Sequence, residues 1–256
     1  MPRFLLLIII FLSTNVFAEN TNLATNEQET DVVEFSELEH RIVELSGLLS
    51  LSEQVKTSAQ YIISQSTVDA EKSEPAGESA LVGINHAQHF GIAQSLSKRW
   101  IETEWENRLL TFIATLDKKE QQQIANDLSQ KTIQSARAKE KAAIRNQSTA
   151  EYLMYMNKLE QRPPAASRWK LVESLDAHSF FSALIVKTRE RVYAEISSQV
   201  EGWQPPIGWK QEAEKEVLEF LFYAYRKTSN PDLAKIANSY QRPALQSFLT
   251  KIQAEL

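Results

Sequence analysis

The histidines and glutamates of this sequence are its candidates for metal binding. His86 and His89 lie three residues apart, so a helix would place both imidazoles on one face. Zinc needs at least three protein ligands, and no third ligand stands near this pair. Glu37 and His40 form one Glu-x-x-His pair, whereas a di-iron site in a helical bundle needs two such pairs and two more glutamates. We therefore predict no metal ion and no cofactor.

Two glutamates could act as a catalytic acid pair. Glu102 and Glu106 are one helical turn apart beside Trp100 and Trp105, a combination found where sugars are cleaved. Carboxylates on an amphipathic helix usually face water instead, and we prefer that interpretation. The sequence contains no nucleophile elbow, phosphate-binding glycine loop, dinucleotide fingerprint or zinc-protease helix. We assign no catalytic residue.

Two tryptophans bracket a pair of prolines in a predicted loop. Trp203 and Trp209 flank Pro205 and Pro206, and rigid aromatic side chains beside prolines could dock a peptide or a sugar. The alternative is that both indoles fold back to seal the end of a helical bundle, because tryptophan is mostly buried. We keep Trp203 and Trp209 as candidate binding residues.

A second aromatic group occupies residues 220–225. Phe222 and Tyr225, together with Phe220 and Tyr223, would cover more than one face of a helix. Either this helix is central, which we favour, or one side of it is a contact surface for a partner or an apolar ligand. Phe222 and Tyr225 complete the set of candidate binding residues.

The amino terminus has the three parts of a secretory signal peptide. Arg3 precedes the apolar run Phe4–Leu12, and small residues end at Ala18. A helix of this apolar run would rise about 14 Å, against a hydrocarbon core of roughly 30 Å, so it is too short for a membrane anchor. We expect cleavage after Ala18 and a periplasmic or secreted protein.

Composition narrows the functional classes further. The chain has no cysteine, which excludes disulfides and thiolate metal sites. It carries 28 basic and 33 acidic side chains, and removal of residues 1–18 takes away only Arg3, leaving a net charge of −6. An acidic protein is a poor ligand for nucleic acid. The helical stretch Arg137, Lys141 and Arg145 is interpreted as a solvated basic face. No later run is apolar enough to span a membrane.

The rest of the sequence predicts helices. There are six glycines, none between Gly91 and Gly202, and the residues that prevail there favour helix over strand. We predict an all-α, irregular multi-helix bundle built from helical hairpins. The expected divisions are a signal peptide (1–18), a flexible polar segment (19–33), a helical hairpin (34–66), a linker (67–79) and a helical bundle domain (80–256).

Capping residues and prolines set the expected helix ends. Helices should begin at Ser36, with Glu39 completing a capping box, and at Ser52, Asp117, Ser148, Ser167 and Asn230. The helix from Asp117 should continue to about Arg145, and the segment from Ser167 should reach Val200. Pro163 and Pro164 should stop one helix, and Pro243 another.

The carboxy-terminal third resembles a family of uncharacterised exported helical proteins of Gram-negative bacteria. The resemblance lies in the run Phe220–Arg226, the turn Thr228–Leu233 and the helix that ends at Tyr240, with a weaker copy near Leu110–Leu128. It implies an exported helical fold and no particular catalytic activity.

These features lead to a ranked set of functions. We predict a periplasmic helical bundle that acts by binding another protein, with an envelope protein as the partner and the oligomeric state left open. The alternative is a carrier of a small apolar ligand, held among Trp100, Trp105, Phe112 and residues 220–225. A hydrolase is the third interpretation.

Overall fold

The computed structural model describes residues 34–72, 84 and 86–256, and every regular element in this part of the chain is an α-helix. The all-α prediction is confirmed. The predicted signal peptide and the polar segment 19–33 lie outside the described residues. The helices are α1 (Glu37–Ser46), α2 (Ser50–Lys72), α3 (His86–Arg99), α4 (Glu102–Ala114), α5 (Lys118–Leu128), α6 (Lys131–Asn146), α7 (Ala150–Gln161), α8 (Ala166–Ser179), α9 (Phe181–Gln199), α10 (Trp209–Ala224), α11 (Asn230–Tyr240) and α12 (Pro243–Glu255).

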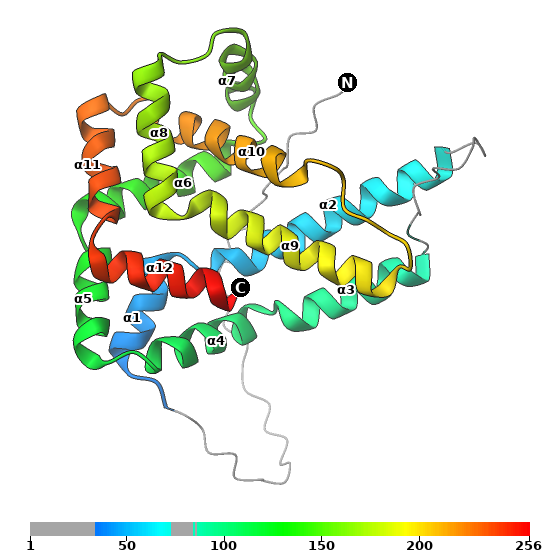
Figure 1. Ribbon diagram of the computed structural model, residues 1–256, viewed down its shortest axis with the longest axis horizontal. Coiled ribbons are helices and arrows are strands. Elements are labelled where there is room, and N and C mark those ends of the chain that lie inside the picture. Colours follow the sequence, from blue (N-terminus) through cyan, green and yellow to red (C-terminus); the bar gives the residue numbers. More distant parts are fainter. Residues whose placement is uncertain (1–33, 73–83, 85) are drawn as a thin grey trace, which may run out of the picture.

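Three helices extend together to one side of the molecule. Helices α2, α3 and α9 run side by side away from the other helices (Figure 1). At one end of these other helices α1 packs against α4 and α5, and at the other α10 is surrounded by α6, α7, α8 and α9. Residues 34–66 were expected to pair as a hairpin. Instead, α1 makes most of its contacts with α4 and α5, and α2 makes most of its contacts with α3 and α9. They are built into the bundle because their apolar faces point toward different neighbours.

Several helix ends follow the expected local chemistry. Ser36 and Glu39 form the predicted capping box at the start of α1, and Gly47 ends that helix in the left-handed conformation. Asp117 caps α5 by accepting a hydrogen bond from the backbone N–H of Glu120 at 2.8 Å. The helix before Pro163 ends at Gln161, as predicted. These signals act within one turn, so sequence alone reveals them.

Two predicted continuous helices are each broken in the structure. The segment from Asp117 divides at Ser129 and Gln130, where Asp127 accepts hydrogen bonds from the side chains of Gln130 and Arg242. The segment from Ser167 divides at Phe180, which adopts φ 58° and ends α8. Each break has a contact with a distant residue. Arg242 contacts Asp127 at the first break, and Gln246 donates to the carbonyl of His178 at the second, so local propensity does not show them.

Other boundaries shift by a few residues. Helix α2 begins at Ser50 rather than Ser52 and reaches Lys72, so residues 67–72 of the predicted linker are helical, while 73–79 lie outside the described residues. The capping residues are Thr149 instead of Ser148 for α7 and Ser229 instead of Asn230 for α11, and α8 begins at Ala166 without a side-chain cap from Ser167.

One apolar core joins the described helices. Trp105 shows how distant elements meet in it: this indole is 1% exposed and its Nε1 donates to the carbonyl of Leu48, at 2.8 Å, in the connection between α1 and α2. No helix within the described residues is long and apolar enough to cross a membrane.

Candidate functional site

The connection between α9 and α10 contains the tryptophan–proline feature singled out in the sequence. Two similar turns delimit it, each ending in a Gly–Trp pair. The backbone N–H of Trp203 donates to the carbonyl of Val200 at 3.1 Å, and that of Trp209 donates to the carbonyl of Pro206 at 3.3 Å. Gly202 has φ 77°, and Gly208 has φ 79° and ψ 7°, the values of the third residue of a type II turn. Glycine suits both positions because a side chain is strained there.

Both tryptophans pack against one residue of α9. The ring of Tyr193 lies 5.7 Å from that of Trp203 and 4.7 Å from that of Trp209, the latter pair edge to face. Trp203 is buried and Trp209 is half-buried. Each aromatic pair contributes about 0.5–1.5 kcal/mol beyond its buried area, so this clamp holds both ends of the loop on the helix.

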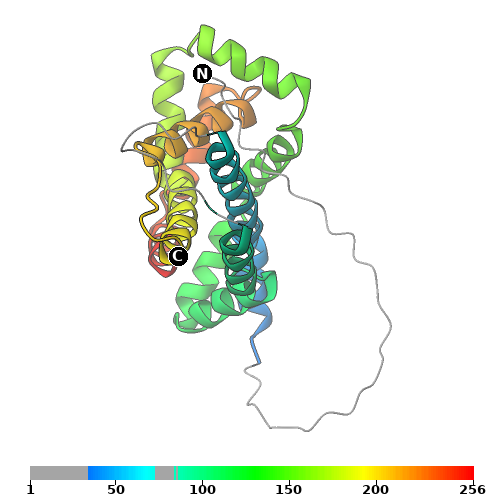
Figure 2. The ribbon, with the colours of Figure 1, turned by 90° about the vertical axis from the view of Figure 1, so that its right-hand side faces the viewer.

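Between the clamped ends, the loop faces solvent. Gln204 and Pro206 are exposed and Pro205 is half-buried. Ile207 has a relative exposure of 106%, the largest among the exposed bulky apolar side chains of the described chain. The loop runs along the outer edge of the molecule from the end of α9 to the start of α10 (Figure 2). We define residues Gln204–Gly208 as the presented loop.

The sequence-based prediction of binding residues therefore needs revision at this site. Trp203 and Trp209 fold back onto the bundle, which was the alternative considered for them, and they support the loop from below. Ile207 and Tyr193 were not recognised in the sequence. Ile207 could have been noticed as a large apolar residue between proline and glycine in a predicted turn, whereas Tyr193 carries no local signal because its role arises from packing.

Phe222 and Tyr225 occupy the opposite end of α10 and are buried. All residues from Phe220 to Tyr225 are buried, because a different helix covers each side of this turn. The central position favoured from the sequence is confirmed. The contacts are Phe220 with Phe181 of α9 (5.6 Å), Phe222 with Trp169 of α8 (4.9 Å) and Tyr223 with Tyr152 of α7 (4.6 Å), measured between ring centroids.

A buried polar cluster joins α6, α10 and α11 beside these rings. The hydroxyl of Tyr225 donates to Glu140 Oε1 at 2.7 Å, and Arg137 lies 3.6 Å from the other carboxylate oxygen. Desolvation raises the pKa of Glu140, while Arg137 and the Tyr225 hydrogen bond oppose the shift in part. Arg137 also lies over the ring of Tyr240. Lys141 faces water as expected of the basic face, but Arg137 is half-buried and takes part in the core.

The aromatic residues proposed for a ligand pocket contact different partners. Trp100 and Trp105 contact each other at 5.2 Å, and Phe112 stacks on Phe248 at 6.2 Å. Residues 220–225 pack on other helices, as described above. The apolar side chains of the predicted carrier site thus fill the core in separate places.

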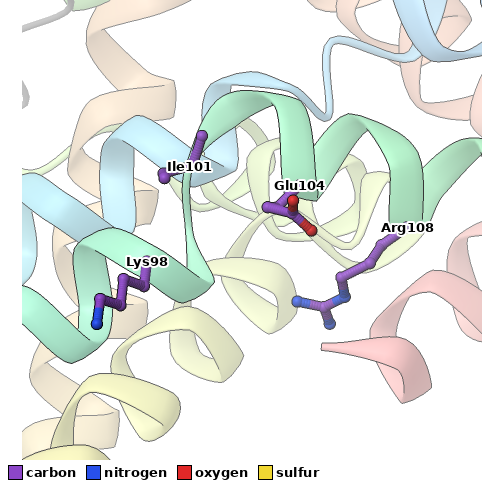
Figure 3. Close-up of a pocket in the computed structure, with 4 residues that line it drawn as sticks. All are labelled: Lys98, Ile101, Glu104 and Arg108. Carbon is purple, nitrogen blue, oxygen red and sulfur yellow. The ribbon is translucent and has the colours of Figure 1, made fainter. Parts of the chain in front are cut away.

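A shallow cleft of about 480 Å³ lies where α3 meets α4. It is lined by Lys98, Ile101, Glu104 and Arg108 (Figure 3). Arg108 stacks over Trp105 and donates to the backbone carbonyl of Glu255, so it links α4 to the end of α12. The cleft is open to solvent and brings together charged side chains of both signs.

The candidate metal and acid residues lie in α1, α3 and α4. His89 is exposed, and the side chain of His86 lies outside the described residues. His40 faces Glu106 at 3.9 Å across α1 and α4, while Glu102 is exposed. Within the described part of the chain, no group of three or more His, Cys, Asp or Glu residues is placed to hold a metal ion.

Comparison with known proteins gives no relative: no family model, no curated protein and no solved structure matches this chain. The functional argument therefore depends on the residues of the chain itself.

Proposed function

We propose that this chain is an exported helical protein that acts by binding another protein of the cell envelope through the presented loop. The observation that carries the proposal is the complete exposure of Ile207 on a turn that is fixed at both ends. An isoleucine transferred from water into an apolar pocket contributes roughly 1.5–3 kcal/mol, and within the described residues the exposed Ile207 leaves that energy unused.

Rigidity makes the loop a better ligand than exposure alone would. Type II turns and the Tyr193 clamp fix the loop in the free protein, so a partner does not have to order it on binding. Loops held by a rigid scaffold are a common location for binding residues.

Export is supported by residues 1–18, which have the pattern of a cleaved signal peptide, and by the resemblance of residues 220–240 to exported helical proteins. We propose cleavage after Ala18 and a periplasmic or secreted mature chain. The absence of cysteine agrees with a bundle that is stabilised by its apolar core instead of disulfides.

Crosslinking in the native cell tests the binding role. A photoreactive amino acid in place of Gln204 should form a crosslink to one envelope protein, and the additional change Ile207→Ala should remove most of that product. The control is Met154→Ala, which removes an apolar side chain that is 60% exposed on α7. Equal crosslinking by the Ile207→Ala and Met154→Ala proteins would remove the basis of the proposal.

Cell fractionation tests the proposed localisation separately. The mature protein should be recovered from the periplasm or the medium with Glu19 as its first residue, determined by mass spectrometry of the intact chain. Recovery of the chain with Met1–Ala18 still attached would contradict the proposed export route.

A further inference from the structure

The backbone of the presented loop has a conformation of its own. Proline fixes φ near −65° and drives the residue before it into extended structure, so Pro206 constrains Pro205 and Pro205 constrains Gln204. Residues Trp203–Pro206 belong to neither a helix nor a strand, and no peptide bond among the described residues is cis. These constraints favour the polyproline II conformation at Gln204 and Pro205.

The exposure of the side chains fits such a helix lying on the protein surface. With three residues per turn, one edge faces the protein and the others face solvent. Pro205 is half-buried, whereas Gln204, Pro206 and Ile207 are exposed. Gln204 and Ile207 are three residues apart, so they share one solvent-facing edge, and Pro206 occupies the other.

The polar groups of the segment are also available. Among the described residues, the backbone hydrogen bonds of this connection use the carbonyls of Val200, Pro206 and Gly208, and none uses the carbonyl of Gln204 or Pro205. The presented loop contains no charged side chain, and the nearest basic residue, Lys210, is paired with Glu190 at 2.9 Å. Recognition must therefore depend on apolar contact and on donors to backbone carbonyls, rather than on charge.

We infer that the presented loop is a preformed polyproline II ligand for a partner domain with an aromatic-lined groove. Such grooves accept proline rings between aromatic side chains and donate hydrogen bonds to the ligand's carbonyls. Here Pro206 would enter the groove, and Ile207 would fill an adjoining apolar pocket. The inference rests on the proposed binding function and specifies the partner's chemistry.

The test compares two variants of the full chain against the protein that is crosslinked through position 204. Pro205→Ala/Pro206→Ala keeps Ile207 and the two glycine turns but releases the backbone from the polyproline II conformation. Ile207→Ala keeps the prolines and removes the exposed apolar side chain of the loop. We expect each variant to bind the purified partner at least about 10-fold more weakly than the unmodified chain, which corresponds to about 1.4 kcal/mol. Each variant's thermal unfolding is measured alongside, so that a loss of binding is assigned only to folded protein.

The outcomes distinguish a failure of the polyproline inference from a failure of the proposed binding function. If the double proline variant binds as tightly as the unmodified chain while Ile207→Ala binds weakly, the loop is a binding site but the polyproline mode is wrong. If both variants bind normally, or if no crosslink depends on Ile207, the proposed function is wrong as well. Crosslinked residues of the partner should be mapped by mass spectrometry, and their location outside any aromatic groove would also overturn the inference.

Discussion

The two ends of α10 are both rich in aromatic residues, yet the structure uses them in opposite ways. At the carboxy-terminal end, residues 220–225 are covered on every side by α6, α7, α8 and α9. At the amino-terminal end, Trp203 and Trp209 both pack on Tyr193 and leave Ile207 in solvent. An aromatic cluster therefore stabilises the fold at one end of the helix and presents a loop at the other.

The difference teaches what to look for when aromatic residues suggest a binding site. Rings distributed around a whole helical turn require neighbours on all sides, and helical bundles supply them. Rings that bracket a short turn can be satisfied by one partner, which leaves the residues between them exposed. We propose that the residue contacting a partner is then the one between the aromatics, which here is Ile207.

The largest expected loss of stability comes from a substitution at the buried end of α10, compared with one on the exposed surface. Phe222→Ala removes a ring that is 2% exposed and packs on Trp169, so it should lower the free energy of unfolding by about 3–5 kcal/mol. The matched surface change Met154→Ala should cost at most about 0.5 kcal/mol. Urea denaturation of both proteins measures the contrast. Similar losses for the two variants would mean that α10 is not central.

A smaller loss is expected when the clamp of the loop is removed. Tyr193→Leu keeps an apolar side chain in α9 but removes two aromatic pairs, at a cost of about 1–3 kcal/mol. It should also increase the rate of proteolytic cleavage within residues 201–208, because the loop would be held less firmly. Limited proteolysis followed by mass spectrometry reports the position of cleavage. An unchanged cleavage rate would show that Tyr193 does not fix the loop.

The polar cluster at the buried end gives a prediction about pH. The raised pKa of Glu140 means that the folded protein retains this proton to a higher pH than the unfolded chain. Stability from this group therefore falls as pH rises from about 4.5 through the folded pKa, with a slope of at most about 1.4 kcal/mol per pH unit. In Glu140→Gln this dependence should vanish, while the acceptor for Tyr225 remains. Unfolding free energies of both proteins between pH 4 and 8 provide the test. If the free energy of unfolding of the unmodified chain instead rose relative to that of Glu140→Gln with rising pH, the assignment would be contradicted.

The smallest effect concerns the turn that presents Ile207. Gly208→Ala places a side chain at φ 79°, with no atom within 4 Å of the new Cβ, so only backbone strain of about 1 kcal/mol is expected. Gly208→Asn should cost less, because asparagine tolerates the left-handed region. Thermal unfolding of the pair ranks the two changes. Equal stability of the alanine variant and the unmodified chain would argue against the type II turn.

Part of this arrangement could be predicted from the sequence, because it depends on interactions between residues that are close together in the chain. The capping box of Ser36 and Glu39, the cap at Asp117 and the central position of residues 220–225 follow from local chemistry or helical periodicity. The break at Phe180 follows from neither, since a residue other than glycine adopts φ 58° there and Gln246 of α12 donates to the carbonyl of His178.

The candidate site likewise combines a feature that the sequence predicts with one that depends on tertiary packing. The sequence indicated a loop bracketed by tryptophans, but the direction of the indoles depended on Tyr193, ten residues before Trp203. No local pattern predicts that contact. Propensity likewise could not show that α1 and α2 would join different parts of the bundle, because each has an apolar face that many partners could cover.

Cysteine accessibility tests the central comparison most directly, because the chain has no cysteine of its own. Single substitutions Ile207→Cys and Ala224→Cys place a thiol at the exposed tip and in the buried cluster, where Ala224 is 8% exposed. In the folded protein, Cys at 207 should react with a maleimide about as fast as in the unfolded chain, and Cys at 224 should react at least about 100-fold more slowly. Similar reaction rates at the two positions in the folded protein would contradict the account.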